Sequence, residues 1–343
     1  MKRPTLKTPP PPEFAYLDLD TALFRASQAG QQVVYSAVDA RGNIVASFES
    51  AKAYSNWIIQ MEVLGCDPLF QYEGDPDHLA REKTIKKGDV KNCYRTFDSI
   101  VKQWVLQSGC KDWTGYISKA SGEKNFRYDI GRIKGYKSSA SREAAKPIYL
   151  EEVRRYARNH PNIKTARGNV EVDDVVAALS QRKGWKGCLV TGDKDGLGVQ
   201  NTHVLIPDEM EKPQFSSKRV LGSLSKNPKG KVVGLGTLFW LHQLLYGDSV
   251  DSIAGCKGVG EVGSYNLLQA FSGVSHDYLP DALAVIAEAY RKAYGEQYEH
   301  VCAISGEVVT RSWKDIMIEM SHLVYMKKSQ NDECFWISII EEI

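Results

Sequence analysis

Three short groups of carboxylates each lie where an apolar run ends or a helical pattern begins. They are Asp18 with Asp20, then Glu171 with Asp173 and Asp174, then Asp193 with Asp195. A further pair, Asp248 and Asp251, lies downstream. Like charges that meet at one edge of a sheet repel each other unless protons or divalent cations neutralise them. The pattern therefore predicts a site for hard metal ions.

Each group taken alone has a simpler interpretation. A single carboxylate after a strand is usually a turn residue or a helix N-cap, and acidic residues at a helix start complement the helix dipole. In 171–174, however, three acidic residues in four positions exceed what capping needs, and helical spacing lets all three line one edge of a site. Alternation along an extended segment sends Asp193 and Asp195 to the same side, with Lys194 pointing away or pairing with one of them.

The elements that must position these groups are those of an α/β fold with a mainly parallel central sheet flanked by helices. FAYLDLD predicts a buried strand followed by a helix, and DWTGYIS and KGCLVTG predict further central strands. The segment 33–48 predicts a hairpin that turns at 41–43. The first carboxylates would then lie at the carboxyl end of a strand, where open α/β sheets bind their ligands.

Composition and charge narrow the class of protein. The 343 residues carry a net charge of only +2, so any electrostatic attraction to nucleic acid must be local. Two such stretches exist, 124–146 with interleaved aromatic residues and 212–231 with no acidic residue. Aromatic rings that alternate with cations suit an unpaired nucleic-acid end, although a solvated charged face gives the same composition.

The remaining compositional features predict a cytoplasmic protein without structural zinc. The seven cysteines are scattered and never spaced as CxxC, which fits a reducing compartment. No apolar run approaches the roughly 20 residues of a membrane span. The first residues lack the apolar core of a secretory signal, and the prolines of 9–12 favour a disordered tail.

Gly258, Gly260 and Gly263 match a GxGxxG pattern between two helical segments. A dinucleotide site needs a strand before the glycines, and here a helix precedes them, so we reject that interpretation. A helix, a glycine hairpin and a second helix can instead offer backbone N–H groups to the phosphates of a nucleic acid. A plain packing corner between two helices is the alternative.

Five segments, in this order and spacing, resemble the flap endonuclease and 5′→3′ exonuclease family, most closely its bacteriophage members. They are YLDLDTALFR, NFRYDIGRIKGYKSSASR, VEVDDVVAAL, VTGDKDGL and GDSVDSIAGCKGVGEVGSYNLL. The resemblance implies a PIN-like core with a basic arch and a helix-two-turn-helix subdomain. The expected divisions are a disordered tail (1–13), the nuclease core (14–205, arch about 118–147), a basic loop (206–235), the helix-two-turn-helix element (236–275) and a C-terminal helical segment (276–343).

The resemblance also implies an activity, a hydrolysis of phosphodiester bonds near a 5′ end with two Mg²⁺ or Mn²⁺ ions. The implied substrate is DNA with a 5′ end or flap, or an RNA primer, in phage DNA replication or degradation. We expect a monomer in the host cytoplasm, with replication proteins as candidate partners and no membrane. The implied metal ligands are Asp18, Glu171, Asp173, Asp174, Asp193, Asp195, Asp248 and Asp251, with Asp20 in a supporting position.

Roles for individual residues follow from the same resemblance. The implied catalytic residues are Asp18, Asp174, Asp193, Lys137 and Arg127. Lys137 would counter charge on the attacked phosphate, Tyr136 would stack on a terminal base, and Arg127 and Arg142 would clamp phosphates. The implied nucleic-acid contacts are Lys124, Arg127, Lys134, Tyr136, Lys137, Arg142, Gly258, Gly260 and Gly263. A K⁺ ion at the glycine hairpin is left open.

The chain departs from the family pattern, and other functions compete. A further Asp is usual before the arch, and this chain has only Ser118, Ala120 and Ser121 there. One alternative is therefore a structure-specific DNA-binding protein with lost or weak nuclease activity. Another is a haloacid-dehalogenase-type phosphohydrolase with Asp18 as nucleophile, because LDLDTAL resembles its DxDxT start, although that chemistry has no use for the arch or the 171–174 group.

Overall fold

The computed structural model describes residues 1–64, 76–119, 124–138, 146–167, 170–327 and 332–343. The chain divides into two compact units, each of which is built from more than one stretch of the sequence. Unit 1 comprises Met1–Ala22, Ile100–Ala145 and Ala157–Ile343, and unit 2 comprises Leu23–Ser99 and Lys146–Tyr156. Three helices carry the chain from one unit into the other: α1 (Asp20–Gln28), α3 (Val90–Ser108) and α5 (Leu150–Arg158).

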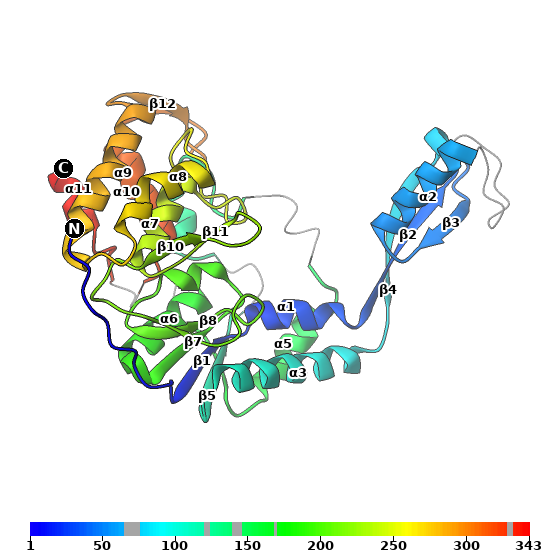
Figure 1. The fold of residues 1–343 in the computed structure, drawn as a ribbon. Coiled ribbons are helices and arrows are strands. Elements are labelled where there is room, and N and C mark those ends of the chain that lie inside the picture. The colour runs from blue at the N-terminus through cyan, green and yellow to red at the C-terminus, as the bar shows by residue number, and fades with distance from the viewer. Residues whose placement is uncertain (65–75, 120–123, 139–145, 168–169, 328–331) are drawn as a thin grey trace. The chain divides into compact units, whose positions relative to one another are not determined.

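A six-stranded sheet in the order β6-β5-β1-β7-β8-β9 forms the centre of unit 1 (Figure 1). Its strands are β1 (Phe14–Asp18), β5 (Asp112–Ile117), β6 (Ile163–Thr165), β7 (Gly187–Val190), β8 (Thr202–Leu205) and β9 (Gln214–Ser216). All neighbouring pairs are parallel except β8 with β9. The predicted α/β fold with a mainly parallel central sheet is therefore confirmed.

The apolar sequence of the central strands explains why they lie inside. All four residues of β7 are buried, and Ala15 and Leu17 of β1 are fully enclosed. Helix α6 (Val172–Lys183) packs on β1 and β7 through residues such as Val176 and Ala177. Parallel strands that are covered on both faces have nearly continuous apolar sequences. Because the strands are parallel, their carboxyl ends lie at one edge of the sheet.

The second half of unit 1 is mainly helical and shares one apolar core with α6 and β7. Its helices are α7 (Thr237–Tyr246), α8 (Glu261–Leu268), α9 (Leu279–Tyr294), α10 (Trp313–Val324) and α11 (Ile337–Glu342). Two hairpins accompany them, β10 (Ser223–Lys226) with β11 (Val232–Leu235) and β12 (Tyr298–Val301) with β13 (Val308–Arg311). The basic stretch expected to be a loop thus contains a hairpin, whose turn is closed by Asn227 Oδ1 accepting the N–H groups of Lys229 and Lys231.

The described part of unit 2 contains an antiparallel sheet in the order β3-β2-β4 and the helix α2 (Ala51–Leu64). The strands are β2 (Gln31–Val38), β3 (Ile44–Phe48) and β4 (Ala80–Lys87). The predicted hairpin is confirmed, because β2 pairs with β3. Asp39 accepts the N–H groups of Arg41 and Asn43, and Gly42 takes a positive φ of 84° that closes the turn.

Short 3₁₀ helices complete the described secondary structure. They are η1 (Pro76–His78), η2 (Phe126–Asp129), η3 (Gly184–Lys186), η4 (Lys194–Gly198), η5 (Gln269–Phe271) and η6 (His276–Tyr278). In the described part of the chain, no helix combines the length and apolarity needed to cross a membrane. Two of these turns, η2 and η4, carry residues of the candidate site.

The substitution Gly198→Ala tests how tightly η4 packs on α7. A Cβ atom at Gly198 would lie 2.0 Å from Nε1 of Trp240, whose indole is itself buried. We expect overpacking to lower the free energy of unfolding by about 1–3 kcal/mol, seen as a lower thermal midpoint. Gly263→Ala in α8 is the matched control, because its Cβ would meet only Val259 Cγ1 at 3.6 Å. Equal midpoints for the two variants would contradict this packing.

Candidate active site

The carboxyl ends of β1 and β7 are tied together by Thr191. Asp18 ends β1 and is 5% exposed. The Thr191 hydroxyl donates to Asp18 Oδ2 at 3.0 Å and accepts the N–H of Asp193 at 3.0 Å. One hydroxyl therefore fixes the distance between two predicted metal ligands. Sequence reasoning missed Thr191, because a threonine after a strand carries no signal of its own.

The end of β5 is joined to the same edge through Asp20. Asp20 Oδ1 accepts the backbone N–H of Ser118 at 2.9 Å and its hydroxyl at 3.1 Å. The backbone N–H of Asp20 donates to Asp18 Oδ1 at 3.1 Å. Ser118, where the sequence lacks a strand-end carboxylate, thus binds a carboxylate that comes from α1. These contacts are compatible with the supporting position expected for Asp20.

Burial and mutual repulsion shift the protonation of these carboxyl groups. Burial, with the charges of Asp20 and Asp193, raises the pKa of Asp18 from 3.8 to about 7. Burial and the charge of Asp193 hold the pKa of Asp195 well above its usual range. Burial and the charge of Asp251 likewise raise the pKa of Asp193. The group holds more negative charge than its cations neutralise, so it favours uptake of protons or metal ions.

The third predicted group begins helix α6. Glu171 is the N-cap, and Asp173 and Asp174 lie in the first turn, where a capping box joins Glu171 to Asp174. Oxygen atoms of the three side chains lie within 4.8 Å of one another. Burial and the charge of Glu171 hold the pKa of Asp173 well above its ordinary value. Capping and clustering, which the sequence offered as alternatives, are therefore both present.

Arg127 lies beneath this helix end and is 3% exposed. Its guanidinium binds Asp174 through two nitrogens, each at 2.9 Å, and donates to Glu171 Oε2 at 2.8 Å. The remaining N–H groups donate to the backbone carbonyl oxygens of Leu323 and Tyr325. All five N–H groups are thus used inside the protein. This burial is at odds with the predicted role of Arg127 as a phosphate clamp.

The carboxylate of Asp174 is in turn saturated with hydrogen bonds. Besides the two bonds from Arg127, its carboxylate accepts the backbone N–H of Lys327 at 2.8 Å and that of Glu171 at 3.2 Å. A metal ion would have to displace hydrogen bonds that hold three segments together. The contacts therefore favour a structural role for Asp174, whereas its predicted roles as ligand and catalytic residue stay predictions.

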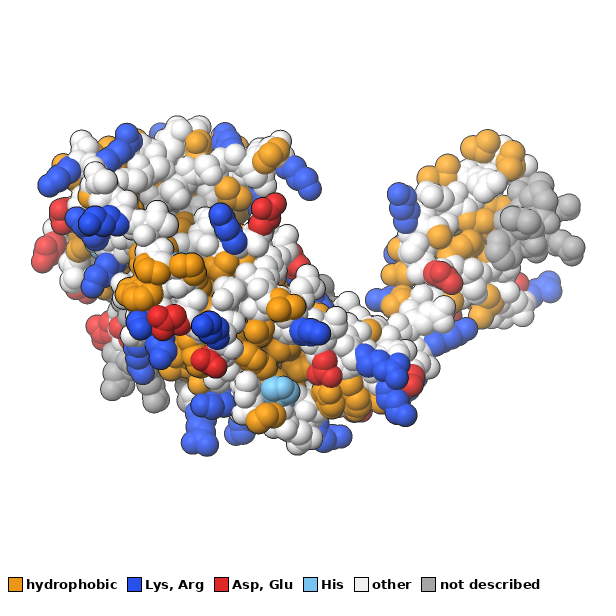
Figure 2. All heavy atoms as spheres, turned by 60° about the horizontal axis from the view of Figure 1, so that its bottom comes forward, with side chains coloured by type: hydrophobic (Ala, Val, Ile, Leu, Met, Phe, Trp, Pro, Cys, Tyr) orange, Lys and Arg blue, Asp and Glu red, His pale blue; other side chains and the backbone are white. Residues whose placement is uncertain are grey.

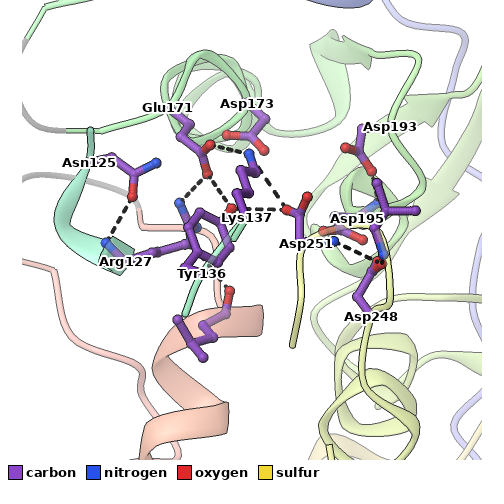
Figure 3. A network of polar contacts seen from close by, with 12 residues as sticks. Asn125, Arg127, Tyr136, Lys137, Glu171, Asp173, Asp193, Asp195, Asp248 and Asp251 are labelled. Atoms are coloured by element: carbon purple, nitrogen blue, oxygen red, sulfur yellow. Dashed lines mark hydrogen bonds and ion pairs between the residues drawn. The ribbon is translucent and has the colours of Figure 1, made fainter. Parts of the chain in front are cut away.

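Tyr136 and Lys137 point into the carboxylates (Figure 3). The Tyr136 hydroxyl lies 2.9 Å from both Glu171 Oε2 and Asp251 Oδ2, and its ring is buried, so it cannot stack on a base as predicted. Lys137 Nζ contacts Glu171 Oε1 and lies 3.6 Å from Asp251 Oδ2. Although burial alone would lower it, these carboxylates raise the pKa of Lys137 above its ordinary value. Lys137 is therefore a permanent cation within the acidic group.

The downstream pair, Asp248 and Asp251, adds two carboxylates to the group that contains Asp193. Asp248 Oδ1 accepts the N–H groups of Val250 and Asp251, which shapes the loop after α7. Of the two alternatives for Lys194, pointing away fits better than pairing with Asp193 or Asp195, because Lys194 pairs with Asp248 Oδ2 at 3.0 Å. Gln243 Nε2 donates to Asp195 Oδ1, a contact from within α7 that no local pattern indicates.

Backbone strain marks the point where these segments meet. Three non-glycine residues in the described ranges have a positive φ, and two of them are Lys137 at 50° and Ser252 at 61°. The Lys137 N–H donates to the carbonyl oxygen of Asp251 at 2.9 Å, so the strained residues flank one hydrogen bond. Left-handed backbone in non-glycine residues is costly and gathers at functional sites.

The other predicted nucleic-acid contacts are two lysines, Arg142 and three glycines. Lys124 and Lys134 are exposed, and Arg142 falls outside the described residues. Gly260 is the N-cap of α8, and a Cβ atom at Gly258 or Gly260 would meet only open space. Gly263 lies within α8, so the glycine segment joins two helices as predicted, and its binding of phosphate or K⁺ stays a prediction. On the face drawn in Figure 2, Lys and Arg side chains are scattered.

The donor set fits divalent ions that prefer oxygen. The eight predicted ligands are carboxylates linked to one another by contacts or mutual repulsion, and Asp174 differs from the other seven in that hydrogen bonds already saturate it: Asp18, Glu171, Asp173, Asp174, Asp193, Asp195, Asp248 and Asp251. Mg²⁺ and Mn²⁺ accept such a shell. Enzymes that carry out metal-assisted hydrolysis use donor sets of this kind.

The substitution Arg127→Met tests the buried ion pair. It would leave Asp174 buried without its counter-charge, so we expect the free energy of unfolding to fall by about 3–5 kcal/mol in urea denaturation. Arg132→Met is the control, because Arg132 is exposed and belongs to the same segment. That change should lower the free energy of unfolding by less than about 0.5 kcal/mol. Similar losses in both variants would argue against the pair as a source of stability.

The raised pKa of Asp18 predicts a pH-dependent stability. Because the pKa rises from 3.8 when exposed to about 7 when folded, the folded protein binds the extra proton between these values. Stability should therefore fall as pH rises through this window. With a chelator present, we expect the thermal midpoint of the wild type to fall more steeply than that of Asp18→Asn. Parallel profiles would show that Asp18 is not protonated in this way.

Comparisons with known proteins extend the resemblance found in the motifs. No protein-family model matches the sequence. The 5′-3′ exonuclease of Aquifex aeolicus (strain VF5) is 30% identical over 109 residues, which are 31% of this chain and 35% of that relative. The match thus spans about a third of the relative's length. T5 5′-exonuclease, solved with divalent metal ions (zinc) bound, aligns with a TM-score of 0.38 and 12% identity, covering 73% of this chain and 88% of that chain.

A TM-score this low supports no inference, so the fold class rests on the strand order of this chain alone. The sequence match confirms that the chain resembles the 5′→3′ exonuclease family.

Proposed function

We propose that this protein is a divalent-metal-dependent 5′→3′ exonuclease or flap endonuclease that hydrolyses phosphodiester bonds near DNA 5′ ends. The observation that carries the proposal is the gathering of carboxylates from β1, the turn after β7, the start of α6 and the Asp248–Asp251 loop, with Lys137 in contact with Glu171 and near Asp251. A DNA-binding protein without turnover has no use for so many repelling carboxylates, since they cost stability.

Two Mg²⁺ or Mn²⁺ ions would be held by carboxylates of this group: Asp18, Glu171, Asp173, Asp193, Asp195, Asp248 and Asp251. When bound, such ions activate a water and stabilise the leaving oxygen. Thr191 orients Asp18, and Gln243 orients Asp195. The partners of metal-binding carboxylates fix their direction and tune their basicity.

Lys137 is the cation best placed to counter charge on a phosphate that enters the acidic group. Its side chain is 20% exposed, whereas Arg127 is buried and serves to hold Asp174 and Glu171 in place. Among the predicted catalytic residues, Asp18, Asp193 and Lys137 therefore keep that role in the proposal. Arg127 and Asp174 become positioning residues.

Basic residues and the glycine segment would bind the substrate. Lys124, Lys134 and Arg142 would follow the phosphates of a strand entering the site, and Gly258, Gly260 and Gly263 would contact duplex phosphates, with K⁺ as a candidate ion there. An RNA primer is a second candidate substrate. The protein would act as a monomer in phage DNA replication or degradation. It would do so in the host cytoplasm, beside replication proteins.

The central test is cleavage of DNA labelled at the 5′ or the 3′ end, as a duplex and as a flap, in Mg²⁺ or Mn²⁺. We expect products that shorten from the 5′ end, and we expect Asp193→Asn to reduce the rate by at least about 100-fold, because even partners of metal ligands contribute 10–100-fold. DNA binding by the variant should persist, because removing a carboxylate lowers repulsion with phosphate.

Asp281→Asn is the matched control, because Asp281 is an exposed aspartate of α9. Its cleavage rate should equal that of the wild type. Wild-type protein that binds these substrates but never cuts them would support the binding-only alternative. Hydrolysis of a small phosphate monoester that depends on Asp18 alone would support the phosphohydrolase alternative.

A further inference from the structure

The segment 127–137, which supplies Tyr136 and Lys137, is held from the C-terminal part of unit 1. Arg127 donates to the carbonyl oxygens of Leu323 and Tyr325, and the N–H of Lys327 binds the same Asp174 that binds Arg127. These residues lie at the end of α10 or directly after it. The sequence offers no chemistry for 276–343, yet that region contacts the candidate site.

Glu319 of α10 makes the most specific of these contacts. Its side chain is 2% exposed, and Oε1 accepts the backbone N–H groups of Arg132 at 2.8 Å and Ile133 at 2.9 Å. Oε2 receives the guanidinium of Arg311 from β13. A buried carboxylate that accepts two consecutive backbone N–H groups fixes that peptide in position and direction, because charge-assisted hydrogen bonds are short and strong.

The β12–β13 hairpin holds the other side of the same peptide. The backbone N–H of Ala303, in the turn of the hairpin, donates to the carbonyl oxygen of Arg132 at 2.8 Å. Arg311 of β13 also donates to the carbonyl oxygen of Asp315 at 2.7 Å. The N–H and C=O of Arg132 are thus both bound by groups from the C-terminal segment.

The turn between Arg132 and Lys137 transmits this constraint. A Cβ atom at Gly131 would lie 2.8 Å from the Lys134 carbonyl oxygen and 3.0 Å from the Tyr136 nitrogen, so the chain folds back closely on itself there. Beyond it, the Lys137 N–H donates to Asp251 O, and the Tyr136 hydroxyl contacts Glu171 and Asp251. A shift of the 132–133 peptide would therefore move Lys137 relative to the carboxylates.

We propose that Glu319 is a positioning residue, which holds the turn 131–137 so that Lys137 lies within the carboxylate group. The kinetic consequence rests on the proposed nuclease function, whereas the placement of Lys137 does not. In this way the C-terminal segment fixes a cation in the site, although it contributes no residue to the carboxylate group itself.

Glu319→Gln and Glu319→Met form the test, because both keep the length of the side chain and only glutamine keeps an acceptor oxygen. In Glu319→Met we expect the amide hydrogen of Lys137 to exchange at least about tenfold faster, with amides of β1 and α6 unchanged. We expect kcat for cleavage to fall by about 10–100-fold with little change in KM. Glu319→Gln should retain most of the protection of the Lys137 amide and most of kcat.

The exposed Glu288 of α9 provides the control, since Glu288→Met removes only an ion pair with Arg291 on the same helix. In a double-mutant cycle, Glu319→Met should add no loss of kcat to Lys137→Met. Equal behaviour of the Met and Gln variants, or unchanged exchange at Lys137 in Glu319→Met, would overturn the proposal. A wild-type protein without nuclease activity would refute the proposed function alone, because the exchange measurement still decides the placement of Lys137.

Discussion

The buried pairing of Arg127 with Asp174 is the interaction on which the candidate site depends. Both side chains are almost fully enclosed, and the guanidinium joins the start of α6 to the residues that end and follow α10. An ion pair removed from water is stable only when every donor and acceptor is satisfied, and here all five N–H groups of Arg127 are used. The pair therefore acts as a rigid support below the carboxylates and contributes no free charge to them.

Above that support, the site is governed by repulsion. Carboxylates from the carboxyl edge of the sheet, from α6 and from the loop after α7 approach one another, and burial raises the pKa of several of them. Lys137 and Lys194 neutralise part of this charge. The strained backbone at Lys137 and Ser252 shows that the fold maintains the arrangement against its local cost. An excess of buried negative charge is the property that metal ions would satisfy.

Much of this could be predicted from local patterns. Apolar runs that end in aspartate identified β1 and β7, and three acidic residues at a helix start identified the beginning of α6. The hairpin of unit 2 followed from its turn residues. Long-range contacts could not be predicted. The local pattern placed Arg127 and Tyr136 on the surface of a basic stretch, where they would contact nucleic acid, but the folded chain buries both side chains.

The sequence by itself determined which residue types stand at strand ends and helix starts, since hydrophobic periodicity and capping act over a few neighbouring residues. Only the tertiary structure decided which carboxylate binds a cation, which binds an arginine and which side chains face solvent. Arg127 and Tyr325 are 198 positions apart, and Glu319 and Arg132 are 187 apart. Such partners meet because folding brings distant segments into one core, where burial makes each unsatisfied polar group costly and so selects its partner.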